Sequence, residues 1–360
     1  MKIVYVLLEP TIGGGVRVIL EFANALSEIG HDVKIVVGSG LKKQLNWFNL
    51  KVPIINVEGT LQYYLRTRSK LLNAAAWKLG YSPNFMDLIA YHIPDCDVSV
   101  ATYSFVTNSV IAANRGRLFY HIQGWEPDFF SGELSNRARA ALHLPLVKFV
   151  NSSWLQRKFE DEMGEKLPII CPGVDVSTFH PLNQNVSNSI GPRNKRIICL
   201  GKGVAFKGVF DLFEALNLVK KEMTNIELVL FGAEDYLAKY SPIKCTYVHL
   251  PVGDTLAKLY SSCDVFVMPS KLESFPLSPL EAMACGVPAV VTNVGVSDYA
   301  INEVNALIVE PSAPKQLAEA ILRVLRDESL SDELRRNGLK TASDFSWINQ
   351  SHKLEKLFMK

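Results

Sequence analysis

Two glutamates enclose a segment whose residue types suit recognition of a phosphorylated sugar. Glu273 opens the run Glu-Ser-Phe-Pro-Leu-Ser-Pro-Leu-Glu, and Glu281 closes it. Residues 265–268 predict a strand before this run, a helix is expected to begin near Ser278, and Gly286 is expected to end it. The unpaired N–H groups of a helix start can receive a diphosphate, and a nearby carboxylate can accept both hydroxyls of a ribose. The segment therefore predicts a nucleotide-sugar site, with a helix-capping Glu281 and a solvated Glu273 as the ordinary alternative.

A second segment, rich in glycine and lysine, follows the strand expected at 196–200. It is Gly-Lys-Gly-Val-Ala-Phe-Lys-Gly and carries Lys202 and Lys207. Two ammonium groups at a strand end can neutralise a diphosphate as it leaves, which stabilises charge that grows in the transition state. The alternative is a pair of surface lysines on either side of a turn.

Three consecutive glycines, Gly13, Gly14 and Gly15, lie between an expected strand and an expected helix. Without side chains, this loop lets a ligand approach the backbone. A dinucleotide fingerprint would need a further glycine where Val18 stands and an acidic residue near Gly38, at the end of the second strand. Binding of a nicotinamide dinucleotide is therefore disfavoured.

His121 ends the strand expected at 117–121 and precedes the sequence Gln-Gly-Trp-Glu-Pro at 123–127. Ligands of open α/β folds bind at the carboxyl ends of the strands, so His121 is the candidate catalytic residue of the first half. A structural histidine is the alternative.

These candidates depend on an alternation of strands and helices along the whole chain. Apolar runs predict strands at 3–8, 33–37, 98–101, 117–121, 148–151, 196–200, 226–231 and 265–268. Parallel strands covered by helices are the natural arrangement for such an alternation. We predict an α/β protein with two Rossmann-like domains, at 1–180 and 196–344, joined by a linker at 181–195 and facing each other across a cleft.

Composition excludes several classes of protein. The 360 residues are 48% hydrophobic and 21% charged, which is typical of globular proteins, and the net charge of +2 gives no footprint for nucleic acid. The six cysteines form no CxxC pair, so we expect reduced packing residues and no metal site. The first ten residues predict a strand and no signal peptide, and no apolar run reaches membrane-spanning length.

A basic stretch at 66–78 interleaves Arg66, Arg68, Lys70 and Lys78 with apolar residues. It could bind anionic lipid or an anionic acceptor, whereas a solvated helix face is the more common case. We expect a cytoplasmic protein, with peripheral contact to the inner face of the cell membrane left open.

Residues 273–288 closely resemble the signature of glycosyltransferase family 4, a group of retaining enzymes with the two-domain GT-B fold. The resemblance implies that Glu273 lies by the donor sugar and that Glu281 holds the ribose. Backbone amides around Phe275, Pro276 and Leu277 would meet the phosphates.

The same resemblance extends to other segments. The loop of Lys202 and Lys207 is similar to the family's phosphate loop, although Lys202 stands where arginine is usual. Gly14 and Gly15 would face the donor phosphates and the acceptor, and His121 would touch the donor sugar. Domain 1–180 would bind the acceptor, domain 196–344 would bind the donor, and the C-terminal helix 345–360 would cross back to the first domain.

The resemblance implies a bacterial, metal-independent, retaining hexosyltransferase that uses no cofactor. A UDP-sugar is the favoured donor, with GDP- and dTDP-sugars as alternatives, and the acceptor would be a saccharide or a lipid-linked molecule. The Gln-Gly-Trp-Glu-Pro motif resembles a subset linked to rhamnose-containing cell-surface polysaccharides. Two other hypotheses stay open: a sugar-nucleotide epimerase that needs no acceptor, and a non-catalytic partner of another transferase that binds nucleotide-sugar.

Overall fold

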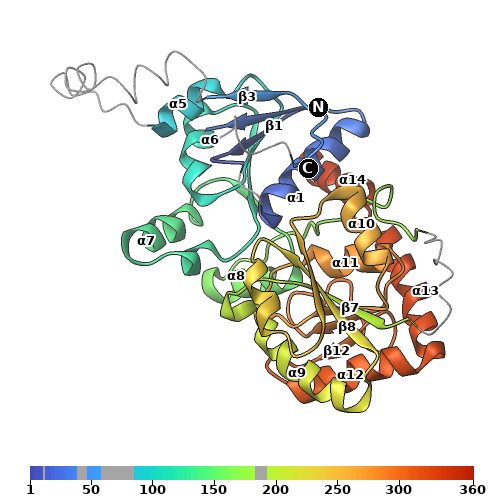
Figure 1. Cartoon of the computed structure of the whole chain (residues 1–360). Helices are drawn as coiled ribbons and strands as arrows, with labels where there is room; N and C mark the ends of the chain where they lie inside the picture. Colours follow the sequence, from blue (N-terminus) through green and yellow to red (C-terminus); the bar gives the residue numbers. More distant parts are fainter. Residues whose placement is uncertain (11–12, 39–46, 58–84, 183–192) are drawn as a thin grey trace. The chain divides into compact units, whose positions relative to one another are not determined.

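The computed structural model describes residues 1–10, 13–38, 47–57, 85–182 and 193–360. The chain forms two compact units, and each is built on its own six-stranded parallel sheet (Figure 1). The first unit comprises Met1–Ile170 and Gln350–Lys360, and the second comprises Cys171–Asn349. This confirms the expected α/β class with one sheet in each half of the chain. Most of the predicted linker 181–195 lies outside the described residues, so the exact domain limits stay a prediction.

The sheet of the first unit has the strand order β3-β2-β1-β4-β5-β6. Its strands are β1 (Lys2–Leu7), β2 (Asp32–Val37), β3 (Ile54–Asn56), β4 (Val98–Ala101), β5 (Arg117–Ile122) and β6 (Val147–Val150). The α-helices are α1 (Gly14–Glu28), α5 (Phe85–His92), α6 (Thr107–Ala113), α7 (Gly132–Ala141), α8 (Ser153–Met163) and α14 (Trp347–Met359). Two 3-10 helices, η1 (Ser104–Val106) and η2 (Glu126–Phe129), follow β4 and β5. The order reverses between β1 and β4, and in open α/β sheets such a switch point is where ligands bind.

The C-terminal helix α14 packs onto the first unit. Its Phe358 ring meets Phe119 of β5 at a centroid distance of 4.8 Å, and the Arg117 guanidinium donates to the Phe358 carbonyl over 2.7 Å. Apolar residues at helical spacing thus cover one face of the sheet. The expected return of the chain's end to the first domain is confirmed.

The sheet of the second unit has the order β12-β11-β10-β7-β8-β9. Its strands are β7 (Lys195–Leu200), β8 (Ile226–Gly232), β9 (Cys245–His249), β10 (Val265–Met268), β11 (Ala289–Thr292) and β12 (Leu307–Val309). The α-helices are α9 (Val209–Glu222), α10 (Gly253–Ser261), α11 (Leu277–Ala284), α12 (Pro314–Arg326) and α13 (Glu328–Asp344), with 3-10 helices η3 (Ala205–Lys207) and η4 (Asp235–Tyr240). Two apolar clusters, one holding residues of α10 and α11 and the other residues of α9 and α12, pack on alternate residues of β7.

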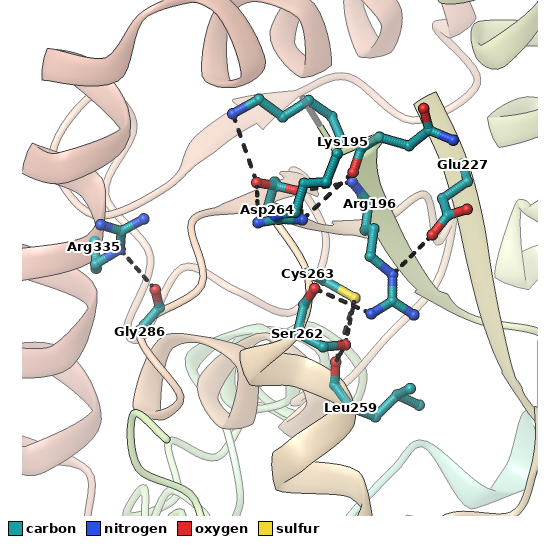
Figure 2. Close-up of polar contacts among 11 residues, drawn as sticks. Lys195, Arg196, Glu227, Leu259, Ser262, Cys263, Asp264, Gly286 and Arg335 are labelled. Carbon is teal, nitrogen blue, oxygen red and sulfur yellow. Dashed lines mark hydrogen bonds and ion pairs between the residues drawn. The ribbon is translucent and has the colours of Figure 1, made fainter. Parts of the chain in front are cut away.

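A charged network fastens the amino-terminal ends of β7 and β10, away from the edge where ligands of such sheets bind. Asp264 accepts two hydrogen bonds of 2.9 Å from the Arg193 guanidinium and one of 2.7 Å from the Arg196 backbone N–H. Figure 2 shows the contacts of Asp264 with Lys195 and Arg196, and the ion pair of Arg196 with Glu227. The network secures the start of β7 directly after the undescribed segment 183–192.

No helix among the described residues is long and apolar enough to cross a membrane. The basic stretch 66–78 lies outside the described residues, so the expected contact with lipid or an anionic acceptor stays a prediction.

Candidate active site

Lys207 and Glu273 form an ion pair in the second unit. The Lys207 Nζ lies 2.6 Å from Oε1 of Glu273, and the Ser270 hydroxyl donates to the same carboxylate oxygen over 2.8 Å. Lys207 ends η3 after β7, and Glu273 follows β10, the neighbouring strand. The pair therefore lies where the carboxyl ends of two adjacent parallel strands meet. The lysine and glutamate side chains are only 18% and 14% exposed, so water screens this pair less than a surface ion pair.

Two glycines allow this close approach of the loops. Gly208 has φ +66°, and a Cβ there would lie 1.9 Å from the Pro269 carbonyl oxygen. Gly295 has φ +67°, and its Cβ would lie 2.7 Å from the carbonyl oxygen of Glu273. Both positions need the left-handed backbone that glycine adopts without strain, and both have backbone where a side chain would start. The loop after β7 can therefore pack against the end of β10.

Lys202 lies in the same loop as Lys207 and is exposed to solvent. It makes no hydrogen bond or ion pair within the described part of the chain. The backbone of its loop is held from β8: the Gly203 N–H donates to the Glu234 carboxylate over 2.8 Å, and the Tyr236 hydroxyl donates to the same oxygen over 2.9 Å. The loop of Lys202 and Lys207 is thus anchored at both ends while Lys202 stays available to a ligand.

Glu281 lies on α11 and is 4% exposed. Its carboxylate accepts a hydrogen bond of 3.1 Å from the Tyr260 hydroxyl of α10. The expected ribose contact of Glu281 therefore involves a carboxylate that is already hydrogen-bonded within the protein.

The segment between the two glutamates lies at the start of α11. The Phe275 side chain is buried against Tyr299 at a centroid distance of 5.2 Å, so only its backbone is a candidate phosphate contact. Pro276 has no backbone N–H and cannot donate to a phosphate, which corrects that part of the expected amide set. No side chain caps the start of α11, and its first turn carries no acidic residue, so its N–H groups suit an anion.

The first unit has a pocket of about 540 Å³ at the carboxyl ends of β1, β4 and β5. It spans the point where the strand order reverses. The residues that line it are Leu7, Leu8, Glu9, Gly13, Gly15, Val16, Ile19, Thr102, Tyr103, Gln123, Gly124, Glu126 and Phe129. Two members of the glycine loop therefore line the pocket, whereas Gly14 does not.

Glu126 links two walls of this pocket. It is 3% exposed, and its carboxylate accepts hydrogen bonds from the Ser104 backbone N–H at 2.8 Å and from the Tyr120 hydroxyl at 2.9 Å. Burial raises the pKa of Glu126, and these hydrogen bonds oppose that rise because they favour the ionised form. The carboxylate joins the loop after β5 to the loop after β4.

His121 lies in β5 with no exposed surface. Its ring stacks on Phe149 at a centroid distance of 4.5 Å and meets Phe22 edge-on at 5.9 Å. Neither ring nitrogen has a hydrogen-bond partner among the described residues, and burial lowers the pKa of His121 to about 3, so the ring is neutral. Contrary to expectation, the structure does not bring His121 to the pocket. Phe22 of α1 and Phe149 of β6 cover the His121 ring, which leaves no surface for a ligand to contact.

One family model matches most of the second unit. Residues 183–341 match the family model described as "Glycosyl transferases group 1". This region is a group 1 glycosyltransferase domain. The chain is 32% identical over 202 residues to an uncharacterized glycosyltransferase of Methanocaldococcus jannaschii, covering 51% of this chain and 52% of the relative. It is 30% identical over 199 residues to D-inositol 3-phosphate glycosyltransferase of Paenarthrobacter aurescens, covering 51% and 49%. The chain thus spans about half the length of the curated relatives it matches.

Solved structures resemble the whole chain. HepE of Anabaena, in complex with UDP-glucose, aligns with 100% of this chain and 99% of its own at a TM-score of 0.78 and 17% identity. Sucrose-phosphate synthase of Thermosynechococcus elongatus aligns with 100% of this chain and 98% of its own at a TM-score of 0.71 and 20% identity. The expected GT-B fold is confirmed.

Three polar residues of these sites were missed by reasoning from the sequence. Ser270 and Tyr260 hydrogen-bond to the two glutamates, and Glu126 joins the walls of the pocket. Glu126 carries the same signal as His121, because it also follows a predicted strand at the edge where ligands bind. Tyr260 had no such signal, since it belongs to the buried face of a helix.

Proposed function

We propose that the chain is a retaining glycosyltransferase that moves a hexose-type sugar from a nucleotide-sugar to a saccharide or lipid-linked acceptor. Its setting would be cell-surface polysaccharide or glycoconjugate synthesis. The observation that carries this proposal is the ion pair of Lys207 and Glu273 at adjacent strand ends, within a region that matches the group 1 family model. Both groups have the charge that a nucleotide-sugar demands: a cation for the diphosphate and a carboxylate for the sugar hydroxyls.

In this proposal the second unit holds the donor. Lys202, Lys207 and the N–H groups at the start of α11 bind the diphosphate, and their positive charge stabilises it as it leaves. Glu273 orients the sugar, and Glu281 accepts the ribose hydroxyls. Donor binding then places a diphosphate oxygen beside the Lys207 ammonium, which the carboxylate of Glu273 holds in position.

The chemical step exchanges one bond to the anomeric carbon for another. The bond from this carbon to the diphosphate oxygen breaks, and the acceptor hydroxyl oxygen forms its bond on the same face of the sugar. The hydroxyl proton passes to the leaving diphosphate oxygen, so no enzymic nucleophile is required. The ammonium groups of Lys202 and Lys207 neutralise the leaving diphosphate in place of a divalent metal ion. We therefore expect full activity in the presence of EDTA. His121, being enclosed by aromatic rings, is assigned no contact with the donor.

A UDP-sugar is the favoured donor, with GDP- and dTDP-sugars next. The support is indirect: the structurally similar HepE of Anabaena binds UDP and UDP-glucose. We place the acceptor in the pocket of the first unit. Rhamnose-containing polysaccharide as the product, and attachment to the inner face of the cell membrane, remain predictions from sequence.

A nucleotide screen tests the proposal. Thermal unfolding is measured with UDP, GDP, dTDP, ADP and NAD, and turnover is then followed with sugars of the nucleotide that stabilises the protein. Selective stabilisation by one nucleoside diphosphate, with acceptor-dependent release of that nucleotide, is the expected result. Epimerised nucleotide-sugar without acceptor would establish the epimerase instead, and tight binding without turnover over a broad acceptor panel would establish a non-catalytic partner.

The variant Glu281→Gln refines this test because it keeps the size of the side chain and removes its charge. It should weaken binding of the nucleoside diphosphate while the melting temperature without ligand changes little. Equal affinity in the folded variant would remove Glu281 from the donor site.

A further inference from the structure

The described lining of the first-unit pocket contains no cationic side chain. Its charged members are Glu9 and Glu126, and both are carboxylates. The start of α1, at Gly13, contributes a partial positive charge of about half an elementary charge at most. A phosphate or carboxylate in this pocket would therefore meet like charges without a compensating lysine or arginine. The charge pattern disfavours an anionic ligand.

Phe129 offers an exposed aromatic face at the same pocket. Its side chain lines the pocket and the residue is 61% exposed, so a ligand can reach the ring. The ring lies over Gly124, where a Cβ would be 2.6 Å from the ring atom Cζ. The lack of a side chain at position 124 thus allows the ring to lie there. An aromatic face of this kind matches the C–H face of a pyranose ring, which is apolar and weakly positive.

Polar groups beside Phe129 suit hydroxyls. The Gln123 side-chain oxygen Oε1 is buried and has no hydrogen-bond partner among the described residues. It can therefore accept a hydrogen bond from a hydroxyl group of a ligand. The Gln123 backbone is held by the Asn151 side-chain amide, which donates to its carbonyl over 3.0 Å. Burial raises the pKa of Tyr103 to about 12, so its hydroxyl stays protonated and can donate. Glu126 adds carboxylate oxygens as acceptors.

We propose that this pocket binds an uncharged pyranose, stacked on Phe129 and hydrogen-bonded by Gln123, Tyr103 and Glu126. The identification of this pyranose as the terminal sugar of the acceptor rests on the proposed function. The claim that the pocket binds a sugar is independent of that function. The consequence is a restriction on the acceptor. A phosphorylated acceptor, such as the inositol 3-phosphate in the name of the relative from Paenarthrobacter aurescens, is rejected here because of the carboxylates.

Saturation-transfer NMR on the full chain tests this inference. The probes are methyl glycosides of glucose, galactose, mannose, rhamnose and N-acetylglucosamine, with glucose 6-phosphate as the charged counterpart. At least one neutral glycoside should receive saturation on its ring protons, and glucose 6-phosphate should not. Phe129→Ala should weaken that binding roughly fivefold to tenfold. Gly124→Ala should weaken it as well, because the new methyl group displaces the Phe129 ring.

Tyr91→Ala is the matched control. Tyr91 is another exposed aromatic residue of the first unit, 74% exposed on α5, and it does not line the pocket. Its removal should leave binding of the glycoside unchanged. Stronger binding of glucose 6-phosphate, no binding of any neutral glycoside, or unchanged binding by the Phe129→Ala variant would each overturn the inference.

The same samples separate this inference from the proposed function. Stabilisation by a nucleoside diphosphate depends on the second unit and should persist in Phe129→Ala. If nucleotide binding and transfer persist while no sugar binds the pocket, the inference fails and the transferase stands. If a glycoside binds but no nucleotide does, the sugar pocket stands and the transferase fails.

Discussion

Removal of the Lys207 ammonium group should impair sugar transfer far more than folding. Lys207→Ala leaves the Glu273 carboxylate with the Ser270 hydroxyl, 2.8 Å away, as a hydrogen-bond donor. The two ion-paired side chains are 18% and 14% exposed, so the lost charge-assisted hydrogen bond should lower the free energy of unfolding by about 1.5–3 kcal/mol. A missing cation at the leaving diphosphate should lower kcat/KM about 100- to 1,000-fold.

Lys271→Ala provides a matched control in the same unit. The Lys271 Nζ lies 2.9 Å from the Asp211 carboxylate, but its side chain is 36% exposed. An ion pair of this exposure contributes about 0–1 kcal/mol, because water screens it. The control should therefore keep nearly all of its stability and its kcat/KM.

The assay follows release of the nucleoside diphosphate at saturating acceptor, with thermal unfolding measured on the same preparations. The donor is the one identified by the nucleotide screen. Wild-type kcat/KM in the Lys207→Ala variant would refute the assignment of this lysine to the leaving group. An equal loss in Lys271→Ala would show that the effect comes from general weakening of the unit.

Three further predictions concern stability. Gly208→Ala should have a lower melting temperature than Gly164→Ala and should lose transfer activity. Both glycines have positive φ, but only a Cβ at position 208 would meet backbone, 1.9 Å from the Pro269 carbonyl oxygen. Equal melting temperatures of the two variants would contradict this prediction. His121→Phe should make the free energy of unfolding depend less on pH. The pKa of His121 is about 3 in the folded chain and 6.5 in the unfolded chain, so the unfolded chain binds the proton first. The stability of the wild type therefore falls as the pH drops below 6.5. Between pH 7 and 5 the wild type should therefore lose about 2 kcal/mol more than the variant, as measured by urea unfolding at both pH values. Asp264→Asn should lower the melting temperature and spare kcat/KM, since its network lies at the amino-terminal strand ends (Figure 2); a variant as stable as the wild type would show that the network adds nothing.

Much of the strand pattern could be predicted from the sequence. The apolar runs at 98–101 and 265–268 coincide with β4 and β10, and the run at 196–200 misses only the first residue of β7. Parallel strands are buried on both faces, so they appear as short continuous apolar runs between turn residues. Lys202, Lys207 and Glu273 were therefore correctly expected to follow strands.

The identity of the pocket-lining residues was harder to predict. His121 and Glu126 lie near the same strand end, and the sequence favoured the histidine. The structure buries the His121 ring between Phe22 and Phe149 and places Glu126 at the pocket. His121 still belongs to β5, whereas Glu126 lies in η2 beyond the end of that strand. Only the packing of segments distant in sequence decides which of the two side chains reaches the pocket.

The sequence by itself determined the α/β class, the two sheets, the glycine loops and the residue types available for chemistry. These properties follow from local signals: apolar periodicity, helix starts and turn residues within a few positions of one another. The tertiary structure alone decided that Lys207 pairs with Glu273, that Gly208 must admit the Pro269 carbonyl, and that Glu281 is already bonded to Tyr260. Each of these contacts joins segments far apart in the chain, and their distance is set by how strands and helices pack.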